Sequence, residues 1–92
     1  MITGPEMKKK LRDMGITVVT SAVHKQSGEY VVKTTHKKLY VRTVSETKRQ
    51  ITSQVKDAVW SLPGKLEVTS VHGPYHNKDK DYIFHFVVKE VS

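Results

Sequence analysis

Three histidines near the carboxyl end are the residues whose type and spacing come nearest to a chemical site. His72, His76 and His85 lie in the stretch VHGPYHNKDKDYIFHF, in a chain that has five histidines. Imidazoles ligate metals and transfer protons near neutral pH, so this stretch raises a metal site or a catalytic site as hypotheses. A metal site needs three or four converging ligands. The spacing of His72 and His76 would converge on a helix, but Gly73 and Pro74 between them exclude a helix.

The preferred interpretation of this stretch is a turn between two strands that carries solvent-facing histidines. The residues after the turn alternate so that one face is apolar, and this places His85 on the other face. The apolar face would carry Tyr82, Phe84, Phe86 and Val88. We therefore predict no metal site.

The sequence also lacks the motifs of catalysis. The chain has no cysteine, which excludes a thiolate ligand, a thiol nucleophile and a disulfide. It has no glycine-rich phosphate loop and no nucleophile motif. Asp79 and Asp81 lie in the run KDKDY, which is more typical of a solvated charge run than of a paired acid and base. We expect a protein that is not an enzyme and that needs no cofactor.

The positive charge is the clearest global signal. Sixteen Lys and Arg residues stand against nine Asp and Glu residues, which gives a net charge of +7. A small domain this basic is typical of nucleic-acid-binding proteins. An acidic protein partner or a small anionic ligand would also suit this charge.

The length and composition predict one domain over residues 1–92. Apolar residues make up 37% of the chain, which is enough for one small core. No stretch approaches the ~18 apolar residues of a membrane-spanning helix. No apolar run follows the charges of the N-terminal segment, as a secretory signal would require. We expect a cytoplasmic protein with no membrane partner.

Two helices have clear start and stop signals. Thr3 and Glu6 form a potential capping box before the first helix, and Gly15 suits its end. The second helix starts near Thr43 or Ser45, either of which can serve as N-cap, and ends at the PG pair at 63–64. The apolar faces of the two helices would carry Met7, Leu11 and Met14, and Ile51, Val55, Ala58, Val59 and Leu62.

Five segments rich in β-branched and aromatic residues predict strands. They cover residues 16–24, 29–36, 38–43, 65–72 and 81–91, and the first three are predicted to form a meander. The order α-β-β-β-α-β-β predicts an α+β fold, with a mostly antiparallel five-stranded sheet and two helices packed on one face.

The second and third predicted strands carry the most informative binding pattern. One face is apolar and suits packing under the helices, with Tyr30, Val32, Thr34, Leu39 and Val41. The other face is basic and carries an aromatic ring, with Val31, Lys33, Thr35, Tyr40 and Arg42. Such a β-ribbon can enter a major groove or lie along a nucleic-acid backbone, and a tyrosine on it can stack on a base. An ordinary solvated sheet face has a similar composition, so a sheet face with no binding role is the alternative interpretation.

The candidate nucleic-acid-binding residues fall into three groups. The ribbon would supply Lys33, Lys37, Lys38 and Arg42 for phosphates and Tyr40 for stacking. The first helix adds Lys8, Lys9, Lys10 and Arg12. Lys48 and Arg49 lie early in the second helix, where cations oppose the helix dipole and slightly lower stability. Their presence there indicates that they bind an external partner.

Two function classes follow from this sequence. The first is a small basic nucleic-acid-binding accessory or regulatory protein, of the kind that phages and mobile elements encode, which binds DNA or RNA mainly through phosphate contacts. The alternative is a non-enzymatic modulator or inhibitor that docks on an acidic surface of a larger protein through a sheet edge and charged turns. The sequence does not distinguish DNA from RNA as the ligand, or a single-stranded from a double-stranded nucleic acid.

Overall fold

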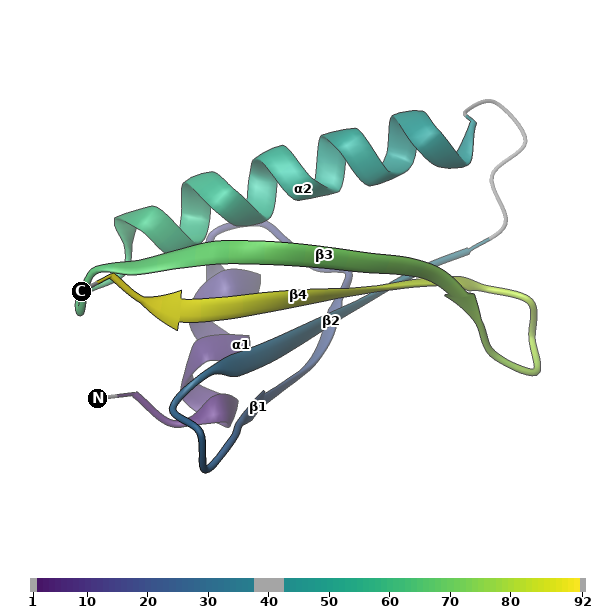
Figure 1. The fold of residues 1–92 in the computed structure, drawn as a ribbon. Coiled ribbons are helices and arrows are strands. Elements are labelled where there is room, and N and C mark those ends of the chain that lie inside the picture. The colour runs from purple at the N-terminus through teal and green to yellow at the C-terminus, as the bar shows by residue number, and fades with distance from the viewer. Residues whose placement is uncertain (1, 38–42, 92) are drawn as a thin grey trace.

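The fold is a sheet of antiparallel strands with helices on one side (Figure 1). The computed structural model describes residues 2–37 and 43–91. Its elements are α1 (Gly4–Asp13), β1 (Val19–His24), β2 (Tyr30–His36), α2 (Val44–Ser61), β3 (Leu66–His76) and β4 (Tyr82–Glu90). In the view of Figure 1, α1 lies behind the sheet and α2 runs along β3. Both chain termini lie at one end of the molecule, and the β3–β4 turn lies at the other.

The sheet topology corrects the predicted strand count and strand order. The described residues contain four strands in the order β1-β2-β4-β3, not five. The predicted meander would have placed a third strand beside β2, but β4 pairs with β2 over its whole length, from Tyr30 to His36. Since β1 occupies the other side of β2, neither side is free. The segment predicted as that third strand, 38–43, falls almost wholly outside the described residues. The α+β class itself is confirmed.

One face of the sheet forms the hydrophobic core with both helices. Val32 of β2 and Phe86 of β4 are paired and fully buried. Met7 and Leu11 of α1 and the apolar face of α2 join the same cluster. The predicted apolar alternation of β4 is confirmed at its buried members Phe84, Phe86 and Val88.

The start and end of α1 follow local chemistry. Thr3 and Glu6 form the predicted capping box, in which each side chain accepts the other residue's backbone N–H. At the other end, Gly15 has φ +95°, and the N–H groups of Gly15 and Ile16 donate to the carbonyls of Arg12 and Leu11. This is the Schellman arrangement that favours glycine. Ile16 is used in this cap, so β1 begins three residues later than predicted.

The second helix begins and ends close to the prediction. The Thr43 hydroxyl accepts from the N–H of Glu46 at 3.1 Å, which makes Thr43 the N-cap in place of Ser45. The predicted apolar stripe of α2 is buried. Leu62 caps the helix just before the PG pair.

Strand β3 is longer than predicted because it absorbs most of the predicted loop. The register shifts at two places, between Val68 and Ser70 and between His72 and Tyr75. Bulges of this kind let a strand accept glycine and proline without ending. The turn is only 77–81, where the Asn77 side-chain oxygen accepts the N–H groups of Asp79 and Asp81. His76 therefore lies on a strand, and its predicted place in the loop is wrong, whereas His72 lies in the strand predicted over residues 65–72.

Two close contacts attach α1 to β1. The Arg12 guanidinium donates to the carbonyl oxygens of Thr17 and Val19 at 2.6 and 2.9 Å. At the other end of α1, Gly4 is buried against the backbone of β1. A Cβ atom at Gly4 would clash with the carbonyl oxygen of Ala22.

We expect Gly4→Ala to destabilise the protein by about 2 kcal/mol, because the added methyl group forces α1 away from β1. Helix propensity alone predicts the opposite sign, a gain of up to about 1 kcal/mol. Chemical denaturation of this variant measures the difference, with Ser45→Ala at an exposed α2 position as the control. A Gly4→Ala protein as stable as the wild type would contradict the close packing.

Candidate nucleic-acid interface on the open sheet face

The face of the sheet opposite the helices carries several rows of side chains across the strands, and two neighbouring rows form the candidate site. We call this face the open face. The strand register places Ser21, Lys33, His85 and His72 in one row, and Thr35, Ile83 and Tyr75 in the next. Paired residues point to the same side of a sheet, so each row is a continuous strip. Neither row contains a carboxylate.

An aromatic contact joins the two rows. The rings of Tyr75 and His85 lie 4.9 Å apart between centroids with a 44° tilt. Tyr75 is 49% exposed, so much of its ring remains accessible. In the neighbouring row, Nε2 of His72 lies 3.2 Å from the Ser70 hydroxyl. The exposed Tyr75 ring therefore lies beside a row that carries two imidazoles and Lys33.

The electrostatics of the open face favour neutral His85. Partial burial lowers the pKa of His85 from its usual 6.5, and the nearby charges of Lys33, His72 and Lys25 lower it further. An anion placed over this row would reverse the effect of those charges and favour the protonated ring. The row is therefore suited to receive a phosphate group.

The structure brings together only part of the predicted ribbon site. Lys33 points to the open face as predicted, and Lys37 is exposed just beyond β2. Lys38, Tyr40 and Arg42 lie outside the described residues.

The predicted cluster on the first helix does not share a face with Lys33. α1 packs on the helix side of the sheet, so Lys8 and Lys10 lie away from the open face. Lys9 forms an ion pair with Asp13 at 2.8 Å, and Arg12 is engaged with two carbonyl groups.

The two predicted cations of α2 have different surroundings. Nζ of Lys48 donates to the carbonyl oxygen of Gly73 at 3.1 Å, which attaches the start of α2 to β3. This contact gives Lys48 a structural role, which the sequence argument from the helix dipole did not foresee. Arg49 is exposed.

The histidines do not gather into a metal centre. Within residues 2–37 and 43–91 no group of three His, Cys, Asp or Glu side chains is placed to hold a metal. His72 and His85 are cross-strand neighbours on the open face. His76 pairs with Tyr82, and the centroids of their rings lie 5.0 Å apart. This pair is one strand position from the pair of Tyr75 and Ile83, so it points to the opposite side of the sheet. The prediction that His85 faces away from the core is confirmed by its pairing with Lys33.

Tyr75 is the residue that sequence reasoning missed. It lies in the segment predicted as a polar loop, because Gly73 and Pro74 precede it. The missed signal is the alternation that continues beyond them, with Tyr75 and His76 on opposite sides of β3.

Comparisons with protein families, curated proteins and solved structures give no match to this chain. Its function therefore has to be argued from the residues themselves. In the ranges that the structure describes, neither helix is long and apolar enough to cross a membrane.

The depressed pKa of His85 gives a pH dependence with a definite sign. The unfolded chain binds this proton more readily, so the stability that neutral His85 contributes is present above pH 6.5 and is lost as the pH falls towards the folded pKa. Burial also lowers the pKa of His36, which acts in the same direction. We expect the free energy of unfolding to fall from pH 7 to pH 5, and His85→Gln to flatten that fall.

The contribution of Lys33 can be measured separately. We expect Lys33→Ala to raise the pKa of His85 towards 6.5, because the variant removes a facing positive charge. Nuclear magnetic resonance titration of the His85 ring measures this value, and Lys56→Ala on the exposed side of α2 is the matched control. Equal pKa values of His85 in both variants would contradict the claim that the charge of Lys33 acts on the His85 ring across the row.

Proposed function

We propose that this protein binds single-stranded nucleic acid across the open face of its sheet. The observation that carries the proposal is the exposed ring of Tyr75. This ring contacts His85, which lies in the same row as Lys33. Unpaired bases stack on aromatic rings displayed by a sheet, largely without regard to sequence. The backbone of the strand then lies along the neighbouring basic row.

The charges around the platform support a phosphate backbone as the ligand. Lys33 lies in the centre of the sheet, and Lys37 extends the same strand outward. His72 is exposed at the far end of the row. The absence of carboxylates from both rows removes a source of repulsion that would oppose an anion.

Sheet topology favours one strand over a duplex. A two-stranded ribbon fits the major groove of B-DNA, which is about 12 Å wide. Strand β2 is flanked on both sides, by β1 and β4, so it cannot enter a groove as one half of a ribbon. The face of a four-stranded sheet offers its side chains to splayed bases instead.

The experiment is a titration of the protein with labelled single-stranded and double-stranded oligonucleotides at two salt concentrations. We expect tighter binding to single strands, with an affinity that falls as salt rises. No binding at low salt would overturn the proposal and favour the alternative, docking on an acidic protein.

The stacking role is tested by Tyr75→Ala. We expect single-strand affinity to fall by about tenfold, because stacking on one aromatic ring is worth about 1–3 kcal/mol. Trp60→Ala removes a second large aromatic residue that is exposed among residues 2–37 and 43–91, and because it lies on α2 the change should leave affinity unchanged. Similar losses of affinity in both variants would mean that the bound nucleic acid does not stack on Tyr75.

The phosphate role is tested by Lys33→Ala. We expect the slope of log affinity against log salt to become shallower by about 0.7, the value for one phosphate contact of a single strand. Lys56→Ala removes the same charge from an exposed position on α2 and should leave the slope as in the wild type. An unchanged slope in Lys33→Ala would exclude Lys33 from the interface.

A further inference from the structure

A second exposed surface lies on the carboxyl-terminal half of α2. Trp60 is the only tryptophan of the chain and is 65% exposed. Apolar residues of this size are normally buried, as Phe84 and Phe86 are. A solvent-exposed tryptophan on a rigid helix is the type of residue that most often carries binding energy in protein interfaces.

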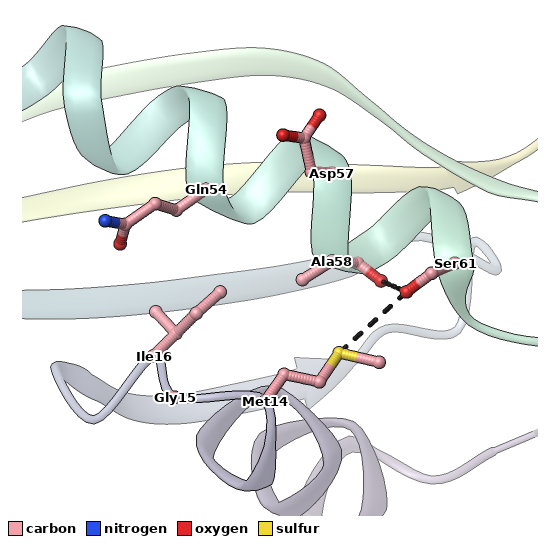
Figure 2. Close-up of a pocket in the computed structure, with 7 residues that line it drawn as sticks. All are labelled: Met14, Gly15, Ile16, Gln54, Asp57, Ala58 and Ser61. Atoms are coloured by element: carbon pink, nitrogen blue, oxygen red, sulfur yellow. Dashed lines mark hydrogen bonds between the residues drawn. The ribbon is translucent and has the colours of Figure 1, made fainter.

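A groove lies between the end of α1 and the carboxyl-terminal half of α2 (Figure 2). Its volume is about 510 Å³, and Met14 and Ile16 line it from one side and Ala58 and Ser61 from the other. The Met14 side chain is 47% exposed, and its sulfur lies 3.9 Å from the Ser61 hydroxyl across the groove. The groove is large enough for an aliphatic side chain.

A second hollow adjoins the first on the other side of α2. Its volume is about 320 Å³, and it is lined by Lys56, Asp57, Trp60, Glu67 and Val68. Asp57 also lines the first groove, so the two hollows share this residue and form one surface. We call it the α2 surface.

The charges of the α2 surface are opposite to those of the chain as a whole. Asp57 and Glu67 are exposed, and within the described part of the chain neither forms an ion pair. Lys56 is the single cation among the residues that line the two hollows. Two carboxylates beside an exposed indole repel phosphates and attract a cation, which an indole face also binds.

We propose that the α2 surface is a docking site for a protein segment that presents an aliphatic side chain next to Arg or Lys. The aliphatic group fills the groove between Met14 and Ala58. The basic group lies over Trp60, where Asp57 and Glu67 neutralise it. This inference does not depend on nucleic-acid binding, because it uses different residues, on and beside α2.

The test uses Trp60 fluorescence and three short capped peptides of alternating residues, Leu–Arg, Leu–Glu and Ser–Arg. We expect the Leu–Arg peptide to change the fluorescence saturably and the Leu–Glu peptide to cause no saturable change. The net charge of +7 by itself favours the acidic peptide, so the expected order cannot arise from overall charge. Saturable binding of the Leu–Glu peptide, or none of the Leu–Arg peptide, would overturn the proposal.

The peptide without leucine tests the groove. We expect the Ser–Arg peptide to bind about tenfold more weakly than the Leu–Arg peptide, because an aliphatic side chain that enters the groove leaves water. Equal affinity of the two would show that the groove takes no part.

Matched charge variants locate the site. We expect Asp57→Asn to weaken binding of the Leu–Arg peptide by about threefold to fivefold, the effect of removing one exposed charge partner. Asp79→Asn removes the same charge from the exposed β3–β4 turn, at the end of the molecule away from the termini, and should leave the affinity unchanged (Figure 1). Equal weakening by both variants would mean that the peptide responds only to overall charge, and this would overturn the proposed site. Both residues are exposed, so circular dichroism is expected to confirm that both variants fold.

Discussion

The pairing of β2 with β4 is the constraint on which the rest of the structure depends. Its register places Val32 opposite Phe86 and, one step along, Lys33 opposite His85. Because side chains alternate along a strand, this one register decides both what the helices bury and what the open face displays. A shift of one residue would turn one of the two strands over, so that either Lys33 would lie under the helices and Val32 on the open face, or His85 would lie under the helices and Phe86 on the open face. Core stability and the proposed binding face are therefore determined by the same set of backbone hydrogen bonds.

The outer elements extend the two faces that this pairing creates. β3 adds His72 and Tyr75 to the open face, and its bulges let the strand pass through Gly73 and Pro74. On the other side, α1 lies close against β1 through Gly4, and α2 covers β3. The molecule thus presents a basic, aromatic sheet face on one side and the α2 surface, with its own exposed tryptophan, on the other. The two proposed binding sites use different residues, so we propose that both can be occupied at the same time.

Local signals in the sequence predicted much of the fold, and long-range ones did not. The capping box of Thr3 and Glu6 and the apolar stripe of α2 depend only on residues close together in the sequence, and both predictions are confirmed. The strand order was wrong because the partner of β2 is β4, a segment distant in sequence that periodicity cannot identify. The same limit applies to the site. Lys33 was placed on the correct face by alternation, whereas Tyr75 was missed because Gly73 and Pro74 usually end a strand.

The central claim is that single strands bind on the open face, and resonance mapping with a short single-stranded oligonucleotide tests it most directly. The backbone and ring signals of the labelled protein are followed during the titration. The account predicts that the largest changes fall on Lys33, Tyr75 and His85, with α1 nearly unaffected. Largest changes at Lys8 and Lys10 on α1 would contradict it, because those residues lie on the helix side of the sheet.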